Sequence, residues 1–326
     1  MEFFKKLIVY ICCFVVIVTI NFTLPRLMPG DPAILLMAQE GVQIRPEQLQ
    51  NLHDELRLDN PLPVQFAAYL SNLLQGDWGF SYQNCQYVST MLREAISCTL
   101  KLALPAIIIS SCISVLLGCL AGYYKNSRYD NICTSALIVL YAVPGFLLGM
   151  VLLYVFSYKL KVFPLGGLYS NDISGGGGKH LFDLIRHLIL PVLSLALSSI
   201  TSKYLIIRSS VAKERDSKYV VYAKARGIGN RSILFKHIFK NSCQPFISVL
   251  GMNIGFIFAG SLVIETVFSL NGMGSLMYNA TVNRDFVVVQ GAFLLLSIIV
   301  ILSNLAADII SIIIDPRIRK GAYDAL

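Results

Sequence analysis

The side chains that could perform chemistry in this sequence are few and scattered. The four histidines are His53, His180, His187 and His237, and only His187 lies near the end of an apolar segment. An intramembrane serine protease needs a serine at membrane depth with a histidine base within reach, and the sequence has no Gly-x-Ser-Gly run. We therefore expect no catalytic residues and no enzymatic activity.

Nucleotide, metal and disulfide sites are also not indicated. The four glycines at 175–178 are followed by Lys179 and His180, so they lack the Lys-Ser/Thr of a phosphate-binding loop, and no such loop occurs elsewhere. We interpret the glycine run as a flexible tip. The eight cysteines show no metal-ligand spacing; a Cys85–Cys98 disulfide is conceivable, because these two alone fall in one predicted outside segment. We expect no cofactor and no bound metal.

The composition is that of an integral membrane protein. Of the 326 residues, 55% are apolar and 14% are charged, whereas soluble chains average about 25% charged residues. The net charge of +8 could indicate nucleic-acid binding, but the basic residues lie beside apolar runs, as the positive-inside tendency produces. We predict an all-α membrane protein that binds no nucleic acid.

Six apolar segments are long enough to cross a bilayer core of about 30 Å. They cover residues 7–24, 100–123, 132–156, 187–207, 245–268 and 286–314. A cleaved signal peptide is the alternative for the first segment, but its apolar core would be about 7–15 residues long and end at small residues. Here the run is longer and ends at Pro25, so we expect a retained span. Pro144 predicts a kink in the third span.

The distribution of basic residues predicts that both termini are cytoplasmic. With six spans, the inside segments and the adjoining span ends contain 17 Lys and Arg, whereas the longer outside segments and their adjoining span ends contain 10, with 12 acids. The predicted parts are a first span within 1–30, an extracytoplasmic helical cap at 31–96, a core of five spans at 97–314 and a basic tail at 315–326. The cap would contain two amphipathic helices, at 46–58 and 63–74.

Three pairs of glycines have the spacing that allows close helix packing in membranes. They are Gly118 and Gly122, Gly145 and Gly149, and Gly251 and Gly255. Each pair could serve static packing between helices, or tight packing of helices that move around a translocation path. Two acids, Glu265 and Asp308, fall in or near spans, where exposure to lipid costs a few kcal/mol. Glu265 would face a path or reach the interface, and Asp308 would bond to a neighbouring helix.

The polar segment at residues 219–245 separates two apolar segments and is predicted to dock on another protein. Residues 219–226 predict a helix whose small residues, Ala223 and Ala225, would let another surface approach closely. Gly227 and Gly229 predict a turn, and Asn230 is the expected N-cap of a second helix. That helix would have an apolar side made of Leu234, Phe235, Ile238 and Phe239, opposite Lys236 and Lys240.

Ala223, Gly227 and the Lys-His-Ile-Phe-Lys-Asn run at 236–241, followed by Pro245, resemble the coupling loop of ABC-importer permeases. The similarity is to the branch that handles dipeptides, oligopeptides and nickel. Further landmarks occur in order along the chain: Leu-Met-Pro-Gly-Asp-Pro at 27–32, Leu-Asp-Asn-Pro-Leu-Pro-Val-Gln at 58–65, Leu-Gln-Gly-Asp-Trp-Gly at 74–79 and the basic tail from Asp315. The resemblance therefore covers nearly the whole chain.

The resemblance implies a permease subunit in a prokaryotic cell membrane that forms half of a translocation path. Its partners would be a second homologous permease, two ATP-binding subunits and an extracytoplasmic solute-binding protein. The coupling loop would span 210–243, and the residues that carry coupling would be Tyr222, Ala223, Lys224, Ala225, Arg226, Gly227 and Ile228. By position, we expect Pro144, Asn253 and Glu265 to line the path.

Two alternatives to peptide import remain open at this stage. The same kind of complex could import nickel or a nickel chelate, although the spans contain no cluster of metal-ligating side chains. A proton-coupled secondary transporter would need several buried ionisable residues and a repeat of two halves. This sequence offers two candidate acids and no evident repeat, so we favour the ATP-driven peptide importer.

Overall fold

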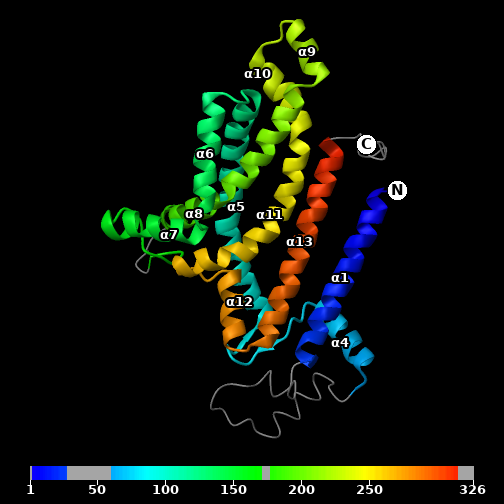
Figure 1. The fold of residues 1–326 in the computed structure, drawn as a ribbon. Helices are drawn as coiled ribbons and strands as arrows, with labels where there is room; N and C mark the ends of the chain where they lie inside the picture. Colours follow the sequence, from blue (N-terminus) through cyan, green and yellow to red (C-terminus); the bar gives the residue numbers. More distant parts are fainter. Residues whose placement is uncertain (1, 28–59, 171–176, 315–326) are drawn as a thin grey trace. The chain divides into compact units, whose positions relative to one another are not determined.

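The computed structural model describes residues 2–27, 60–170 and 177–314, without the side chains of 2–6, 24–27, 177, 252–260, 312 and 314. The described chain is almost entirely helical (Figure 1). Its elements are α1 (Glu2–Leu27), α4 (Leu62–Leu74), β1 (Phe80–Ser81), β2 (Gln86–Tyr87), α5 (Val88–Tyr123), α6 (Arg128–Ala142), α7 (Gly145–Leu152), the π-helix η1 (Leu153–Lys159), α8 (Gly177–Arg215), α9 (Lys218–Ala225), α10 (Asn230–Ser232), the π-helix η2 (Ile233–Ile238), α11 (Phe239–Val267), α12 (Met273–Val282) and α13 (Phe286–Ile314).

The chain forms two compact units. The first unit contains Thr99–Leu270 and the chain from Leu302 onward, and the second contains Phe3–Cys98 and Asn271–Ile301. Within the first unit, α8 packs against α6, α7 and α11.

Members of the three glycine pairs lie where helices of the first unit approach one another closely, as their spacing predicted. A Cβ atom at Gly122 in α5 would lie 2.6 Å from the carbonyl oxygen of Arg208 in α8. A Cβ atom added at Gly145 in α7 would lie 2.9 Å from the Cβ of Ser198 in α8, and one added at Gly251 in α11 would lie 2.5 Å from the Cβ of Ala307 in α13. Larger side chains at these positions would separate the helices. The last member, Gly255, falls among the side chains that are not described.

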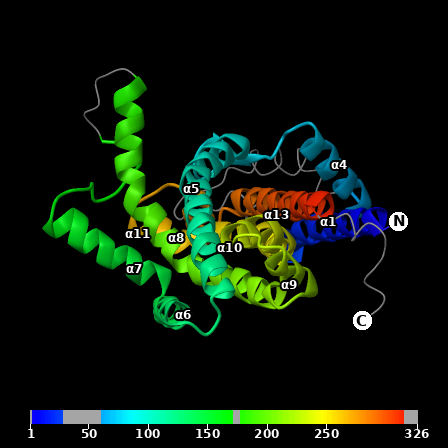
Figure 2. The same ribbon diagram turned by 90° about the horizontal axis from the view of Figure 1, so that it is seen from above.

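The third predicted span is broken rather than continuous. α6 ends at Ala142, α7 begins at Gly145, and the two helical arms are bent by 90° (Figure 2). Pro144 is the N-cap of α7, and Val143 before it is extended (φ −88°, ψ 121°). Proline lacks an N–H donor and disfavours helical backbone at the preceding residue. The kink was therefore predicted correctly, but the single helix over 132–156 was not.

Three helices of the described chain, α5, α8 and α13, are long and apolar enough to cross a membrane, or four if the bent pair counts as one span. α1 contains a shorter apolar stretch, Leu7–Thr23. α8 begins at Gly177, well before the predicted start at residue 187, so half of the glycine run predicted as a flexible tip is helical. Gly175 and Gly176 lie outside the described residues. The six-span arrangement stays a prediction.

The second unit combines α1, α4, the β1–β2 hairpin, α12 and parts of α5 and α13. The ring of Phe22 in α1 lies 5.1 Å from that of Phe66 in α4. Asn21 and Gln290 each donate from the side-chain amide to the other's backbone carbonyl, at 2.9 and 2.6 Å. α4 matches the helix predicted at 63–74, whereas the helix predicted at 46–58 lies outside the described residues.

The conceivable disulfide between Cys85 and Cys98 is not formed. Cys85 is exposed at the turn between β1 and β2, whereas Cys98 is buried in α5. In the described part of the chain all cysteines are thiols.

Candidate coupling surface and its anchors

The predicted docking element is a helix, a glycine turn and a second helix. α9 covers Lys218–Ala225, close to the predicted 219–226. Gly227 has φ +74°, the left-handed backbone that favours glycine after a helix. The turn is closed by two backbone hydrogen bonds, from Gly227 N–H to Lys224 at 2.9 Å and from Ile228 N–H to Ala223 at 3.2 Å. Gly227 therefore sets the direction in which the chain leaves α9.

The start of the second helix differs from the prediction by one residue. Gly229 is the N-cap (φ −64°, ψ 143°), and Asn230 is already helical. The side-chain oxygen of Asn230 instead accepts a hydrogen bond from the Tyr123 hydroxyl at 2.8 Å. The Tyr123 ring also lies 5.8 Å from the Lys224 ammonium, a cation–π distance. Tyr123, at the end of α5, thus contacts both arms of the element, and sequence reasoning did not single it out.

The apolar side predicted for the second helix was partly wrong. Residues 233–238 form the π-helix η2, whose wider turns change which positions share a face. Leu234 and Ile238 are buried as predicted and are joined by Ile233, but Phe235 is 44% exposed.

The inner side of the docking element belongs to a hydrophobic cluster of the first unit. This cluster contains Cys119, Tyr123, Ile207, Val211, Val220, Ala223, Ile233, Leu234, Ile238 and Phe246. It therefore joins α9 and η2 to α5, α8 and α11. Tyr219 of α9 adds a hydrogen bond to Glu214 of α8 at 2.7 Å, and burial raises the pKa of the Tyr219 phenol.

The predicted coupling residues divide between the two sides of the element. Ala223 is only 8% exposed and lies in the cluster, so it cannot offer the open contact that the sequence predicted. Tyr222 is 71% exposed, and its neighbour Val221 is 61% exposed. The other coupling residues, Lys224, Ala225, Arg226 and Gly227, are also exposed, and Ile228 is half-buried. We call the exposed set, 221–222 and 224–227, the coupling surface.

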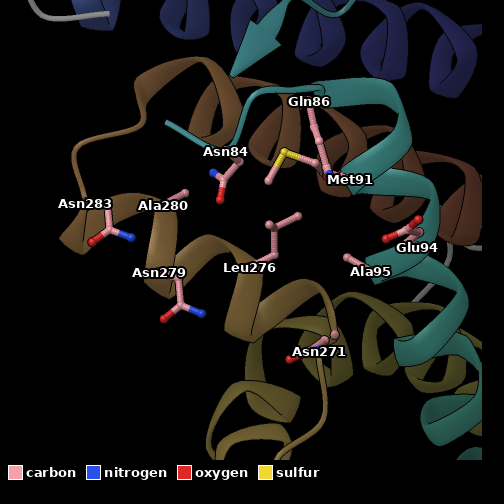
Figure 3. Close-up of a pocket in the computed structure, with 11 residues that line it drawn as sticks. Asn84, Gln86, Met91, Glu94, Ala95, Asn271, Leu276, Asn279, Ala280 and Asn283 are labelled. Atoms are coloured by element: carbon pink, nitrogen blue, oxygen red, sulfur yellow. The ribbon is translucent and has the colours of Figure 1, made fainter. Parts of the chain in front are cut away.

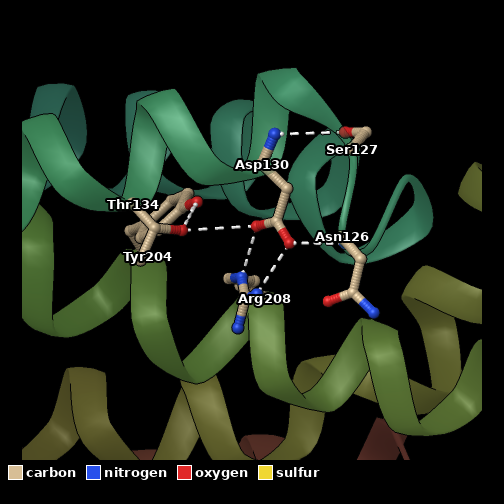
Figure 4. A network of polar contacts seen from close by, with 6 residues as sticks. All are labelled: Asn126, Ser127, Asp130, Thr134, Tyr204 and Arg208. Carbon is tan, nitrogen blue, oxygen red and sulfur yellow. Dashed lines mark hydrogen bonds and ion pairs between the residues drawn. The ribbon is translucent and has the colours of Figure 1, made fainter.

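An ion pair between the buried Asp130 and the partly exposed Arg208 joins α6 to α8 in the same unit (Figure 4). Asp130 is fully buried and accepts hydrogen bonds from Arg208 Nε at 2.5 Å and Nη2 at 2.7 Å. The backbone N–H of Asn126 donates to the same carboxylate at 2.9 Å, and Thr134 donates at 3.3 Å. Ser127 caps α6 by accepting from the Asp130 N–H at 3.1 Å. Sequence reasoning missed this pair, since Ser127-x-x-Asp130 indicates the start of a helix and not a partner 78 positions away.

The three predicted path residues have different surroundings. Glu265 is fully buried and accepts hydrogen bonds from Thr99 at 2.7 Å and Ser261 at 2.9 Å, so it does not reach an interface. Pro144 is exposed at the start of α7. Asn253 lies in α11, but its side chain is outside the described residues.

Another buried charge was not predicted. Lys203 of α8 is fully buried, and its ammonium donates to Ser110 of α5 at 2.6 Å. No group of His, Cys, Asp and Glu in the described chain could hold a metal ion.

Comparison with known families assigns the chain to a class. Residues 114–320 match the family described as binding-protein-dependent transport system inner membrane component, and residues 2–108 match the N-terminal part of such membrane components. The chain belongs to this family, so it is a multi-pass permease of a bacterial transport system, and the resemblance to ABC-importer permeases is confirmed. The family is a transport family and not an enzyme family.

Individual relatives align along nearly the full length. A putative peptide transport system permease of Brucella abortus is 34% identical over 304 residues, covering 93% of this chain and 94% of the relative. The oligopeptide transport system permease OppB of Haemophilus influenzae is 33% identical over 318 residues, covering 97% and 98%. A probable peptide ABC transporter permease of Sinorhizobium fredii is 32% identical over 298 residues, covering 91% and 92%.

Proposed function

We propose that this chain is one of two homologous permeases in an ATP-driven importer of short peptides. The observation that carries the proposal is the alignment with peptide permeases over 91–97% of the chain. Nickel or a nickel chelate is the weaker alternative, since the named relatives are peptide permeases. The further partners are two ATP-binding subunits and an extracytoplasmic binding protein.

The coupling surface is proposed to contact an ATP-binding subunit. Its exposed residues project from an element whose inner side is packed on α5, α8 and α11. A force that the ATP-binding subunit exerts on Tyr222 or Arg226 would therefore be transmitted to these helices through buried side chains. Tyr123 and the Gly227 turn are proposed to keep the two arms in a fixed relation, so that the force is transmitted instead of absorbed.

Uptake measurements test the proposed cargo and energy source. We expect cells that lack this chain to lose most uptake of labelled short peptides while nickel uptake is unchanged. Peptide uptake in wild-type cells should survive an ionophore that collapses the proton gradient, because ATP drives transport. Loss of nickel uptake that excess peptide does not compete would move the assignment to metal import, and sensitivity to the ionophore would favour a proton-coupled carrier.

The proposed topology has six spans and both termini in the cytoplasm, with a cap at 31–96 outside. It places Cys85 outside and the coupling surface inside. Two single-cysteine versions, one retaining only Cys85 and one carrying only Ala225→Cys, would be treated with a membrane-impermeant maleimide in intact spheroplasts. We expect Cys85 to be labelled and the cysteine at 225 to react only after permeabilisation. The reverse pattern would contradict the topology.

A further inference from the structure

A pocket in the second unit has no role in the function proposed above. Its volume is about 310 Å³, close to the lower limit for small-molecule sites. The β1–β2 hairpin, the first turns of α5, the Asn271–Gly272 segment and α12 line it (Figure 3). Asn84, Met91 and Leu276 point toward one another across the hollow.

The lining is rich in carboxamides. Five of its residues are amides and one is acidic: Asn84, Gln86, Asn271, Asn279, Asn283 and Glu94. Among the described residues that line the pocket, none is Lys, Arg or aromatic. Except for Asn84, these six side chains make no hydrogen bond within the part of the chain that the structure describes. A carboxamide offers both donors and an acceptor, so the pocket can bond a ligand that presents both.

Asn84 is held in place by a buried network. Its side-chain amide donates to Ser81 Oγ at 3.1 Å and to Asp285 Oδ2 at 3.2 Å, and its backbone N–H donates to Ser81 Oγ at 3.0 Å. Asp285 is only 3% exposed and also accepts from the Ser81 hydroxyl at 2.5 Å. This network fixes the hairpin beside the start of α13 and leaves the carbonyl oxygen of Asn84 available to a ligand.

We propose that this pocket binds a short extended peptide segment, with an ammonium group of the segment at Glu94. Peptide groups carry one donor and one acceptor each, which matches free carboxamides on both walls. The single carboxylate favours a cation, and the absence of basic lining residues disfavours phosphate or carboxylate ligands. Met91 and Leu276 supply apolar contact for a side chain of the segment. The inference rests on the proposed peptide transport.

The segment has two possible sources with the same chemistry. It is either the free peptide cargo or an exposed stretch of the binding protein that delivers it. The experiment therefore has two arms, both with the complete transport complex in lipid nanodiscs. One arm measures binding of a pentaalanine peptide labelled at its C-terminus, without the binding protein. The other measures docking of the binding protein.

The variants remove hydrogen-bonding groups from the pocket. Asn279→Ala/Asn283→Ala should weaken pentaalanine binding about tenfold, since each lost hydrogen bond contributes about 0.5–1.5 kcal/mol and about 1.4 kcal/mol is a factor of ten. Glu94→Gln should weaken binding of the free-amine peptide but not of its N-acetylated form. The matched control is Asn72→Ala, an exposed asparagine of α4 outside the pocket, which should change nothing.

Each outcome decides the proposal. Weaker pentaalanine binding identifies cargo as the occupant, and weaker docking with unchanged peptide binding identifies a segment of the binding protein. If neither measurement changes in the pocket variants, the inference is overturned. Peptide uptake by the wild-type complex is measured in the same preparation, and its absence would contradict the proposed function instead.

Discussion

Replacement of Gly227 by valine is expected to abolish transport while the chain stays in the membrane at normal abundance. Gly227 has φ +74°, which a β-branched residue adopts only with strain. Apart from Gly227 itself and its two chain neighbours, no described residue has an atom within 4 Å of the position that a Cβ would occupy, so the cost is backbone strain and not a clash. The chain can relieve this strain by opening the turn, which redirects α9 and the coupling surface. Peptide uptake measures the loss of transport, and immunoblotting of membranes measures the abundance of the chain.

Gly229 provides a matched control two residues away. It also has no atom within 4 Å of its Cβ position, but its backbone is extended at φ −64° and ψ 143°. Gly229→Ala should therefore keep most transport. Gly227→Asn should keep part of it, because asparagine tolerates the left-handed conformation better than other residues. Wild-type transport by Gly227→Val at normal abundance would show that the coupling assignment is wrong.

Replacement of Arg208 by methionine is expected to have the largest effect on stability. The variant leaves the fully buried Asp130 carboxylate without its guanidinium partner. Breaking a fully buried pair in this way costs about 3–5 kcal/mol in soluble proteins, and the 26% exposure of the Arg208 side chain places this pair toward the low end of that range. We therefore expect a strong decrease in the melting temperature of the purified complex, together with a decrease in the abundance of this chain.

A double variant that removes both charges distinguishes the cost of an unpaired buried carboxylate from the cost of lost packing. Asp130→Asn together with Arg208→Met leaves no buried charge, so the double variant should recover much of the stability. Arg231→Met is the surface control, because Arg231 is exposed in α10, and it should melt like the wild type. Equal melting temperatures for Arg208→Met and the wild type would show that the pair does not stabilise α6 against α8.

The sequence predicted those features that depend on neighbouring residues. The apolar segments predicted as spans are helical for most of their described length, because a run of apolar residues specifies a membrane helix by itself. The turn after α9 was predicted since glycine is the residue that enters left-handed backbone at low cost. The position of the break at Pro144 was predicted for the same local reason, but its 90° angle was not.

Contacts between distant residues could not be predicted. Asp130 and Arg208 are 78 positions apart, and no periodicity relates them. The burial of Ala223 depends on a cluster drawn from α5, α8 and α11, so its small size indicated packing inside the chain as much as contact with a partner. The hydrogen bond from Tyr123 to Asn230 likewise depends on how α5 and the docking element come together.

The π-helix η2 has a consequence for how the length of this chain can vary between relatives. η2 connects the short α10 directly to α11 without a loop. A π turn holds one residue more than an α turn, and such a turn takes up an extra residue inside an otherwise regular helix. A single-residue deletion within 233–238 would return the helix to α geometry and leave both flanks in their present orientation. Loss of one residue should therefore be tolerated here, whereas in the middle of α11 it would rotate every later side chain by about 100°.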